Sequence, residues 1–502
     1  MGLLDFFKKR SPEEQFQEAI EEKDYITIVN LGKELLSRHP DSLSILNPYV
    51  EALVKLGKKD EAVNLLLSYA EKKIRDEYFE LAIPVLKRAL KIDPLNIRAA
   101  MLLADAYKKK ELYYDAFKVL TDAYEKFRVS GIPTSRIKEL LESFIQEQFH
   151  PIFYEKYGDI LAQEGQKDEA VVNLVMAANM FMNLKNYKAA LRALLKAQRL
   201  NRTESIDRQI VEAAAYLGTN NVIPVIVTLL NNYKDEPDFI RATVEIFKEA
   251  GNLKLLKEIA QNIKNPKLQY ALLALINYEL GEVEEGREYL NKLRLIDANM
   301  YEKLAAAIKA RHGIDETAIG FPAHEELPEP EQILEVLEQA IDLGPSLDLE
   351  ELVNEWTSHI DVEEKPEDLK AEIVTLKEMD KDGSRYTSMA EALLGLEKYD
   401  EAIEAAKKAL NTNQSGKAVL LIGEAYRLKG DYKGALTFLL DQLQNPNLSE
   451  VDKARIKVLM GEIYEERGNL EKALYWYREA NKLLKDEELK RKIEEIEANE
   501  RI

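Results

Sequence analysis

Hydrophobic and polar positions alternate with helical periodicity along most of the chain, and short polar turns interrupt them at regular intervals. The clearest example is the stretch 457–484, in which Gly461 and Tyr464 lie one helical turn apart. After a turn, Ala473 and Tyr477 share one face of a second helical pattern. The small residues let two antiparallel helices approach closely, and the tyrosines fill the space beside them. The pattern therefore predicts a helix–turn–helix hairpin.

The same spacing of small residues recurs elsewhere. Ala402, Ala435 and Ala473 follow one another at similar intervals, and Ala82 and Ala116 are separated by a comparable distance along the chain. This pattern resembles the tetratricopeptide repeat, a helical hairpin of about 34 residues. One hairpin cannot bury its apolar face alone, so copies stack. The resemblance implies an all-α fold, a right-handed superhelical solenoid of antiparallel hairpins in two arrays.

Some stretches depart from the regular repeat. From 207 to 263, helical pairs continue without the signature small residues, and we expect non-consensus hairpins there. Ala62 and Ala82 are closer together than one repeat length, and so are Ala170 and Ala190. Each of these two short intervals predicts one long helix that ends one hairpin and begins the next.

Composition and repeat pattern together divide the chain into six segments. The repeats pause where proline and acidic residues become frequent, and they resume near residue 383. The predicted segments are an amphipathic N-terminal segment (1–11), an N-terminal helical repeat array (12–312), an acidic, proline-containing linker (313–330), an acidic helical connector (331–382), a C-terminal repeat array (383–485) and a capping helix (486–502).

The net charge of −20 is concentrated in one part of the chain. Residues 313–382 hold 22 Asp or Glu and 4 Lys, which is −18 of the total. A run of this kind is either a solvated face or an acidic surface that attracts a basic partner. No basic stripe with interleaved aromatic residues occurs, so we expect no nucleic-acid binding.

The residues that carry catalysis or bind metals are scattered or missing. The chain has no cysteine, and its 5 histidines show no metal-ligand spacing. No phosphate-binding loop, dinucleotide fingerprint or nucleophile elbow occurs. We therefore predict that the protein is not an enzyme and uses no cofactor. No apolar run approaches the roughly 20 residues of a membrane span, and the predicted location is cytoplasmic.

The first ten residues have a distinct pattern. Apolar side chains gather on one face of a short predicted helix and cationic side chains follow them: Leu3, Leu4, Phe6, Phe7, Lys8, Lys9 and Arg10. One interpretation is an amphipathic helix that binds the anionic inner face of a membrane. The alternative is a hydrophobic cap on the first repeat.

The family resemblance also implies a binding surface, because such repeats bind peptides or helices on their concave face. One concave position directly follows the small packing residue, and in this chain it is repeatedly acidic, with Asn179 and Leu275 as exceptions. A clamp of Lys, Arg and Asn for a C-terminal carboxylate is therefore absent. We predict a groove for a basic or amphipathic helical ligand, unless the acidity is only a habit of the family. The predicted partner-binding residues are Glu51, Glu71, Asp105, Asp159, Glu391, Glu424 and Glu462.

These observations favour a non-enzymatic scaffold or adaptor whose partners are other proteins. Two alternatives stay open. One is a membrane-surface assembly factor of envelope, pilus, secretion or motility machinery, held by residues 1–10. The other is a regulatory subunit of an enzyme complex. The sequence does not specify the oligomeric state.

Overall fold

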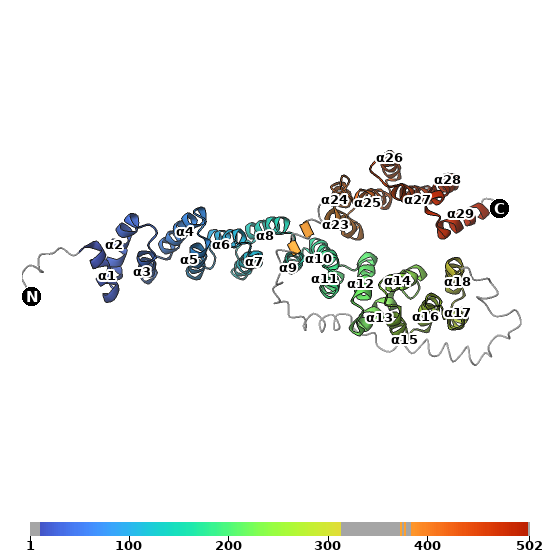
Figure 1. The fold of residues 1–502 in the computed structure, drawn as a ribbon, viewed down its shortest axis with the longest axis horizontal. Coiled ribbons are helices and arrows are strands. Elements are labelled where there is room, and N and C mark those ends of the chain that lie inside the picture. The colour runs from blue at the N-terminus through green and yellow to red at the C-terminus, as the bar shows by residue number, and fades with distance from the viewer. Residues whose placement is uncertain (1–10, 313–371, 374–375, 378–382, 500–502) are drawn as a thin grey trace, which may run out of the picture. The chain divides into compact units, whose positions relative to one another are not determined.

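The chain is built from α-helices joined by short turns (Figure 1). The computed structural model describes residues 11–312, 372–373, 376–377 and 383–499, and no strand occurs in these ranges. The predicted all-α helical repeat fold is confirmed, whereas the handedness of the superhelix stays a prediction. None of the described helices is long and apolar enough to serve as a membrane span.

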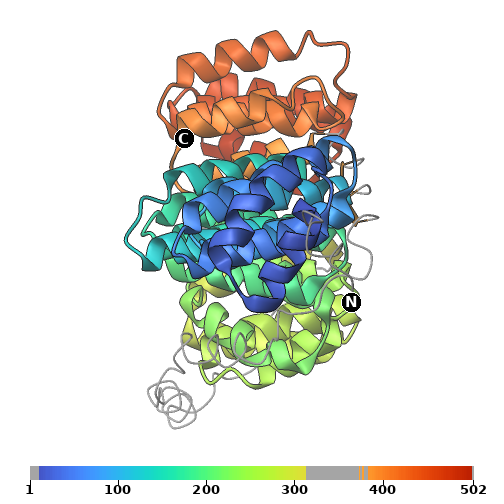
Figure 2. The same ribbon diagram turned by 90° about the vertical axis from the view of Figure 1, so that its left-hand side faces the viewer.

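The described residues form two compact units. Unit 1 takes residues 11–149 with 372–373, and its helices stack as antiparallel neighbours (Figure 2). Its first helix begins with a capping box, in which Ser11 Oγ accepts from the Glu14 backbone N–H at 3.1 Å. The helices of unit 1 are α1 (Pro12–Glu22), α2 (Tyr25–Arg38), α3 (Leu43–Lys55), α4 (Lys59–Arg75), α5 (Phe79–Ile92), α6 (Ile97–Lys109), α7 (Tyr113–Val129) and α8 (Ser135–Glu147).

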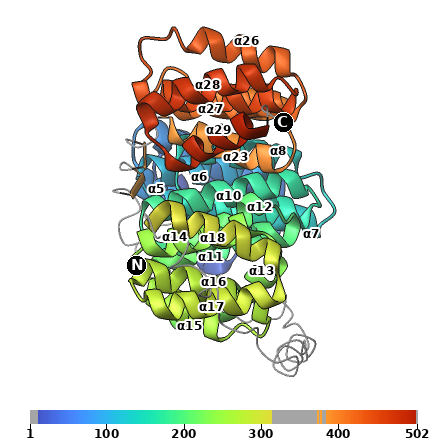
Figure 3. The same cartoon turned by 90° about the vertical axis from the view of Figure 1, so that its right-hand side faces the viewer.

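Unit 2 takes the described residues from 150 onward, apart from 372–373. Its antiparallel pairs include α16 with α17 and α27 with α28 (Figure 3). Its elements are α9 (Pro151–Gln163), α10 (Lys167–Asn183), α11 (Tyr187–Leu200), α12 (Glu204–Leu217), the 3₁₀-helix η1 (Asn220–Val222), α13 (Ile223–Asn232), α14 (Pro237–Glu249), α15 (Leu253–Gln261), α16 (Pro266–Leu280), α17 (Val283–Ile296), α18 (Ala298–His312), α23 (Ser384–Gly395), α24 (Tyr399–Lys407), α25 (Ser415–Leu428), α26 (Tyr432–Gln442), α27 (Glu450–Glu466), α28 (Leu470–Leu484) and α29 (Glu487–Asn499).

Small residues set the distance between paired helices, as the sequence pattern predicts. A Cβ placed on Gly158 would lie 2.9 Å from Leu174 Cγ, and one on Gly423 would lie 2.7 Å from Leu439 Cδ2. Both distances are shorter than real Cβ contacts, so an added Cβ would force the neighbouring leucine side chains to shift. Ala473 is fully buried between its helix and the neighbouring ones.

Helix α10 is the element on which unit 2 is assembled. It is the long helix predicted between Ala170 and Ala190, and it packs against both α9 and α11. It also packs against α23, which in turn contacts α12. The helices after residue 383 therefore start beside the middle of unit 2, and this packing creates the groove described below.

The last described helix covers the end of the C-terminal repeats. Leu489, Ile493 and Ile496 of α29 are buried against a cluster that includes Ala473 and Tyr477. This apolar face closes the stack, and the polar face of α29 turns to solvent.

Several predictions concern residues outside the described ranges. These are the amphipathic segment 1–10, the linker 313–330 and nearly all of the connector 331–382. The two compact units divide between residues 149 and 150, inside the array predicted for 12–312. The predicted segment boundaries stay predictions.

Candidate functional site

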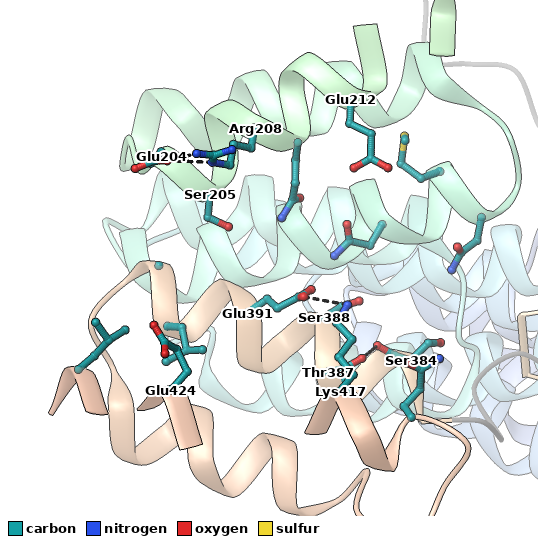
Figure 4. Close-up of a pocket in the computed structure, with 18 residues that line it drawn as sticks. Glu204, Ser205, Arg208, Glu212, Ser384, Thr387, Ser388, Glu391, Lys417 and Glu424 are labelled. Carbon is teal, nitrogen blue, oxygen red and sulfur yellow. Dashed lines mark hydrogen bonds and ion pairs between the residues drawn. The ribbon is translucent and has the colours of Figure 1, made fainter. Parts of the chain in front are cut away.

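A groove of about 850 Å³ lies inside unit 2 between α10 and α12 on one side and α23 and α25 on the other (Figure 4). We call it the central groove. Most of its lining is polar, and only a few apolar side chains reach it. The lining residues are Asn179, Met182, Asn183, Glu204, Ser205, Arg208, Gln209, Glu212, Ser384, Thr387, Ser388, Glu391, Leu394, Gly395, Gln414, Lys417, Glu424 and Leu428.

Two of the four carboxylates in the central groove are neutralised by neighbouring cations. Arg208 lies one turn after Glu204 on α12, and their side chains form an ion pair of 2.7 Å. Lys417 of α25 reaches across to Glu391 of α23, with 2.8 Å between Nζ and Oε1 (Figure 4). These two pairs leave little net charge on their part of the lining.

Glu424 shares its cation with another carboxylate. Arg427 Nε donates to Glu424 Oε2 at 2.8 Å, and the same guanidinium also pairs with Glu466 of α27. The hydrogen bonds with Glu424 raise the pKa of Arg427, against the effect of its partial burial. One positive charge therefore balances two negative ones at this end of the groove.

Glu212 on α12 is the groove carboxylate that has no ion pair with any described residue. Figure 4 shows its side chain directed from α12 toward the groove. Glu212 is exposed, and partial desolvation together with the negative charges of Glu249 and Glu391 raises its pKa. The positive charge of Lys417 offsets only part of this rise. A carboxylate without an ion pair beside other carboxylates is a site that a cation would stabilise.

Gln209 lies one turn before Glu212 and also lines the groove. Its Oε1 atom is buried and accepts no hydrogen bond from the described part of the chain. A buried acceptor without a donor costs free energy.

The structure brings together only some of the predicted partner-binding residues. Glu391 and Glu424 line the central groove, and so does Asn179, which the sequence analysis treats as an exception. Glu462 lies on α27, where desolvation raises its pKa. The remaining four are elsewhere: Glu51, Glu71 and Asp105 belong to unit 1, and Asp159 lies on α9 of unit 2.

Most of the predicted acidic positions already have a cation. Arg98 binds Glu71 at 2.6 Å, and Lys109 binds Asp105 at 3.6 Å. Glu51 is exposed on α3. The sequence analysis did not foresee this compensation. The sequence feature that indicates such an ion pair is a basic residue two helices further along the chain. Arg98 on α6, for example, pairs with Glu71 on α4.

Asp159 belongs to a charge cluster between α9 and α11. Lys196 donates to Asp159 at 2.8 Å and to the buried Glu155 at 2.9 Å. Arg192 makes two further hydrogen bonds with Glu155, at 2.8 and 2.6 Å. Because these groups satisfy one another, the cluster stabilises the pairing of the two helices rather than presenting a free site.

Sequence reasoning missed Glu212, the residue that distinguishes this groove. It lies in the stretch 207–263, where no small-residue pattern assigns positions to a face. Its neighbours in the groove come from α23, far away in the sequence. Within the described ranges, no three Asp, Glu or His side chains gather in a metal-binding arrangement. The chemistry that the groove offers is the binding of a cation and hydrogen-bond donors.

Comparison with known proteins gives one match to a family. Residues 387–447 match the model of the tetratricopeptide repeat. No curated protein matches the chain. Among solved structures, the chain is similar to the crystal structure of the APC/C hetero-tetramer Cut9-Hcn1, with 12% identity, a TM-score of 0.20 and coverage of 98% of this chain and 96% of that one. It is also similar to yeast Tom70, with 12% identity, a TM-score of 0.22 and coverage of 96% and 97%. TM-scores this low carry no argument about the present chain.

Proposed function

We propose that this chain, which belongs to the tetratricopeptide repeat family, is a scaffold that holds a cationic segment of a partner protein in the central groove. The observation that carries the proposal is the unpaired carboxylate of Glu212 in a polar groove. A Lys or Arg side chain of the partner would pair with it without breaking the ion pairs already present.

Other features of the groove support a peptide-like ligand. Its volume of about 850 Å³ is enough for a few residues rather than a whole helix. Asn179 and Asn183 offer both donors and acceptors. Met182 and Leu394 provide limited apolar surface for the stem of a Lys or Arg side chain.

The test is a binding titration of the full-length protein with a fluorescently labelled decalysine peptide. Glu212→Gln should weaken binding about 1.5- to fivefold, since an ion pair of an exposed carboxylate contributes roughly 0.2–1 kcal/mol. Glu22→Gln is the matched control, because it removes the same charge from an exposed position of α1 in unit 1 that is not among the predicted partner-binding residues. It should leave the dissociation constant unchanged.

Two results would contradict the proposal. If both variants weaken binding equally, decalysine responds only to net charge. If neither variant weakens it, decalysine binds outside the central groove. Circular dichroism of both variants checks that helicity is retained.

A further inference from the structure

We infer that the binding of a cationic ligand in the central groove and the packing of α23 on α10 and α12 stabilise each other. We call the form in which α23 packs on these two helices the seated form. The inference rests on the proposed function and adds how the same site is controlled. Its basis is that the groove has two walls from distant parts of the chain. Neither wall contains the site by itself, because Glu212 belongs to one and Glu391 to the other.

At one end of the groove, residues of the two walls lie close together. Lys398 Nζ, at the start of α24, lies 3.1 Å from Asp168 Oδ2 at the start of α10. A Cβ placed on Gly395 would lie 3.4 Å from Thr203 Oγ1 and 3.6 Å from Ser205 Cβ. A methyl group at Gly395 would therefore just reach van der Waals contact with residues at the start of α12.

The groove side of the two walls carries more carboxylates than cations. Glu212 and Glu391 project toward the groove from opposite walls, and Lys417 pairs with Glu391 at 2.8 Å (Figure 4). The charges of Glu249 and Glu391 raise the pKa of Glu212, and the charge of Lys417 partly offsets them. One cation thus lies near two carboxylates that belong to opposite walls. A ligand cation would be attracted to both walls and would hold them together.

Binding and seating are then linked. A ligand that binds only the seated form shifts the equilibrium by its differential affinity. At a ligand concentration of ten times the dissociation constant, the ratio of seated to unseated protein increases about elevenfold. This linkage is reciprocal. A chain locked in the seated form therefore binds the ligand more tightly than the wild-type chain, by the factor by which the unseated population reduces the apparent affinity.

The chain offers a clean experiment because it has no cysteine of its own. In the double variant Ser205→Cys with Gly395→Cys, the Cβ separation of 3.6 Å suits a disulfide, for which about 3.5–4.5 Å is usual. In a glutathione redox buffer, the disulfide and the two free thiols of this cysteine pair are in equilibrium. The fraction of protein with the disulfide therefore reports how much of it is in the seated form. Decalysine at ten times its dissociation constant should raise the ratio of oxidised to reduced protein severalfold, and decaglutamate should not. The matched control is Ser205→Cys with Thr437→Cys, because Thr437 lies on α26, which packs on α25 and α27.

Each result has a defined meaning. A pair that oxidises no faster than the control shows that α23 is not seated on α12 and overturns the inference. A pair that oxidises readily but ignores bound decalysine overturns the linkage and leaves the proposed function intact. If decalysine does not bind the wild-type chain at all, the proposed function fails first and the linkage fails with it.

A second measurement avoids substitution altogether. A carbodiimide joins amines to carboxylates without a spacer, and the 3.1 Å pair Lys398–Asp168 is a suitable target. Mass spectrometry of the wild-type chain should find this crosslink when the carbodiimide acts without decalysine, whose own amines would compete for the activated carboxylates. Absence of the crosslink under conditions that join Lys417 to Glu391, which lie 2.8 Å apart, would overturn the seating.

Discussion

At Gly461 the backbone of α27 approaches α28 so closely that an added Cβ would overlap ring carbons Cδ1 and Cε1 of Tyr477. The ring cannot move away, because Tyr477 is fully buried and its hydroxyl donates to Glu465 at 2.5 Å. Burial, followed by this hydrogen bond, raises the pKa of the Tyr477 hydroxyl. The glycine is therefore required by a neighbouring side chain and not by the backbone of its own helix.

We predict that Gly461→Ala lowers the free energy of unfolding by about 1–3 kcal/mol through overpacking. This loss exceeds the gain of about 1 kcal/mol that alanine brings inside a helix. Gly395→Ala is the control, since its Cβ would meet no atom closer than 3.4 Å. Urea unfolding measures both variants. A Gly461→Ala variant as stable as the wild type would contradict the close approach.

Charge burial gives a second residue-scale prediction, between α9 and α11. Desolvation alone would raise the pKa of Glu155, but the hydrogen bonds and charges of Arg192 and Lys196 outweigh it and lower the pKa. Glu155→Gln leaves a buried guanidinium without its counter-charge and should cost about 3–5 kcal/mol. Asp159→Asn should cost much less, because desolvation raises the pKa of Asp159 despite Lys196 and its charge is already disfavoured. Equal losses in urea unfolding would contradict this ranking.

The same carboxylate predicts a pH dependence. The pKa of Glu155 is lowered in the folded state, so its contribution is complete above the ordinary value of 4.5. The contribution is lost as the pH falls through the lower folded-state pKa. The stability difference between wild type and Glu155→Gln should therefore be constant near neutral pH and shrink below pH 4.5. Urea unfolding curves of both proteins, recorded at about one-unit intervals between pH 3 and pH 7, measure this stability difference. A difference that stays constant to the acid limit would mean that folding does not lower the pKa of Glu155.

At the scale of elements, the ion pair Lys398–Asp168 ties the start of α24 to the start of α10. Lys398→Glu would place three carboxylates together, since Glu169 follows Asp168. We expect faster hydrogen exchange in α23, because the partly exposed pair contributes about 0.2–1 kcal/mol to its packing. Adding Asp168→Lys should restore slow exchange. If the double variant exchanges as fast as the single one, the two side chains do not interact in solution.

The same scale shows how much of the fold can be predicted from sequence. Helix pairs such as α27 and α28 follow from local signals, because Gly461, Ala473 and the glycine turn between them fall within one repeat. The packing of α23 on α10 does not, because many other helices separate the two along the chain and no periodicity links them. The site divides in the same way. Glu391 and Glu424 follow from the repeat register, whereas Glu212 becomes a site residue only through that distant packing.

At the scale of the whole molecule, most of the net negative charge and the central groove belong to different parts of the chain. Residues 313–382 carry −18 of the net −20, whereas the central groove has only a small surplus of carboxylates. Distributed charge accelerates the encounter of oppositely charged molecules, and charge at the contact itself slows dissociation. The two contributions can therefore be separated by kinetics.

The last prediction uses this separation in stopped-flow binding of labelled decalysine to the full-length chain. Replacing Glu325, Glu326, Glu329 and Glu331 by Gln should lower the association rate constant about two- to tenfold at low salt. This effect should vanish near 0.5 M salt, where screening acts within about 4 Å. Glu212→Gln should mainly raise the dissociation rate constant and should keep part of its effect at high salt, because the groove is partly desolvated. If the four-glutamine variant raises the dissociation rate instead, the acidic segment itself holds the cation and the groove does not.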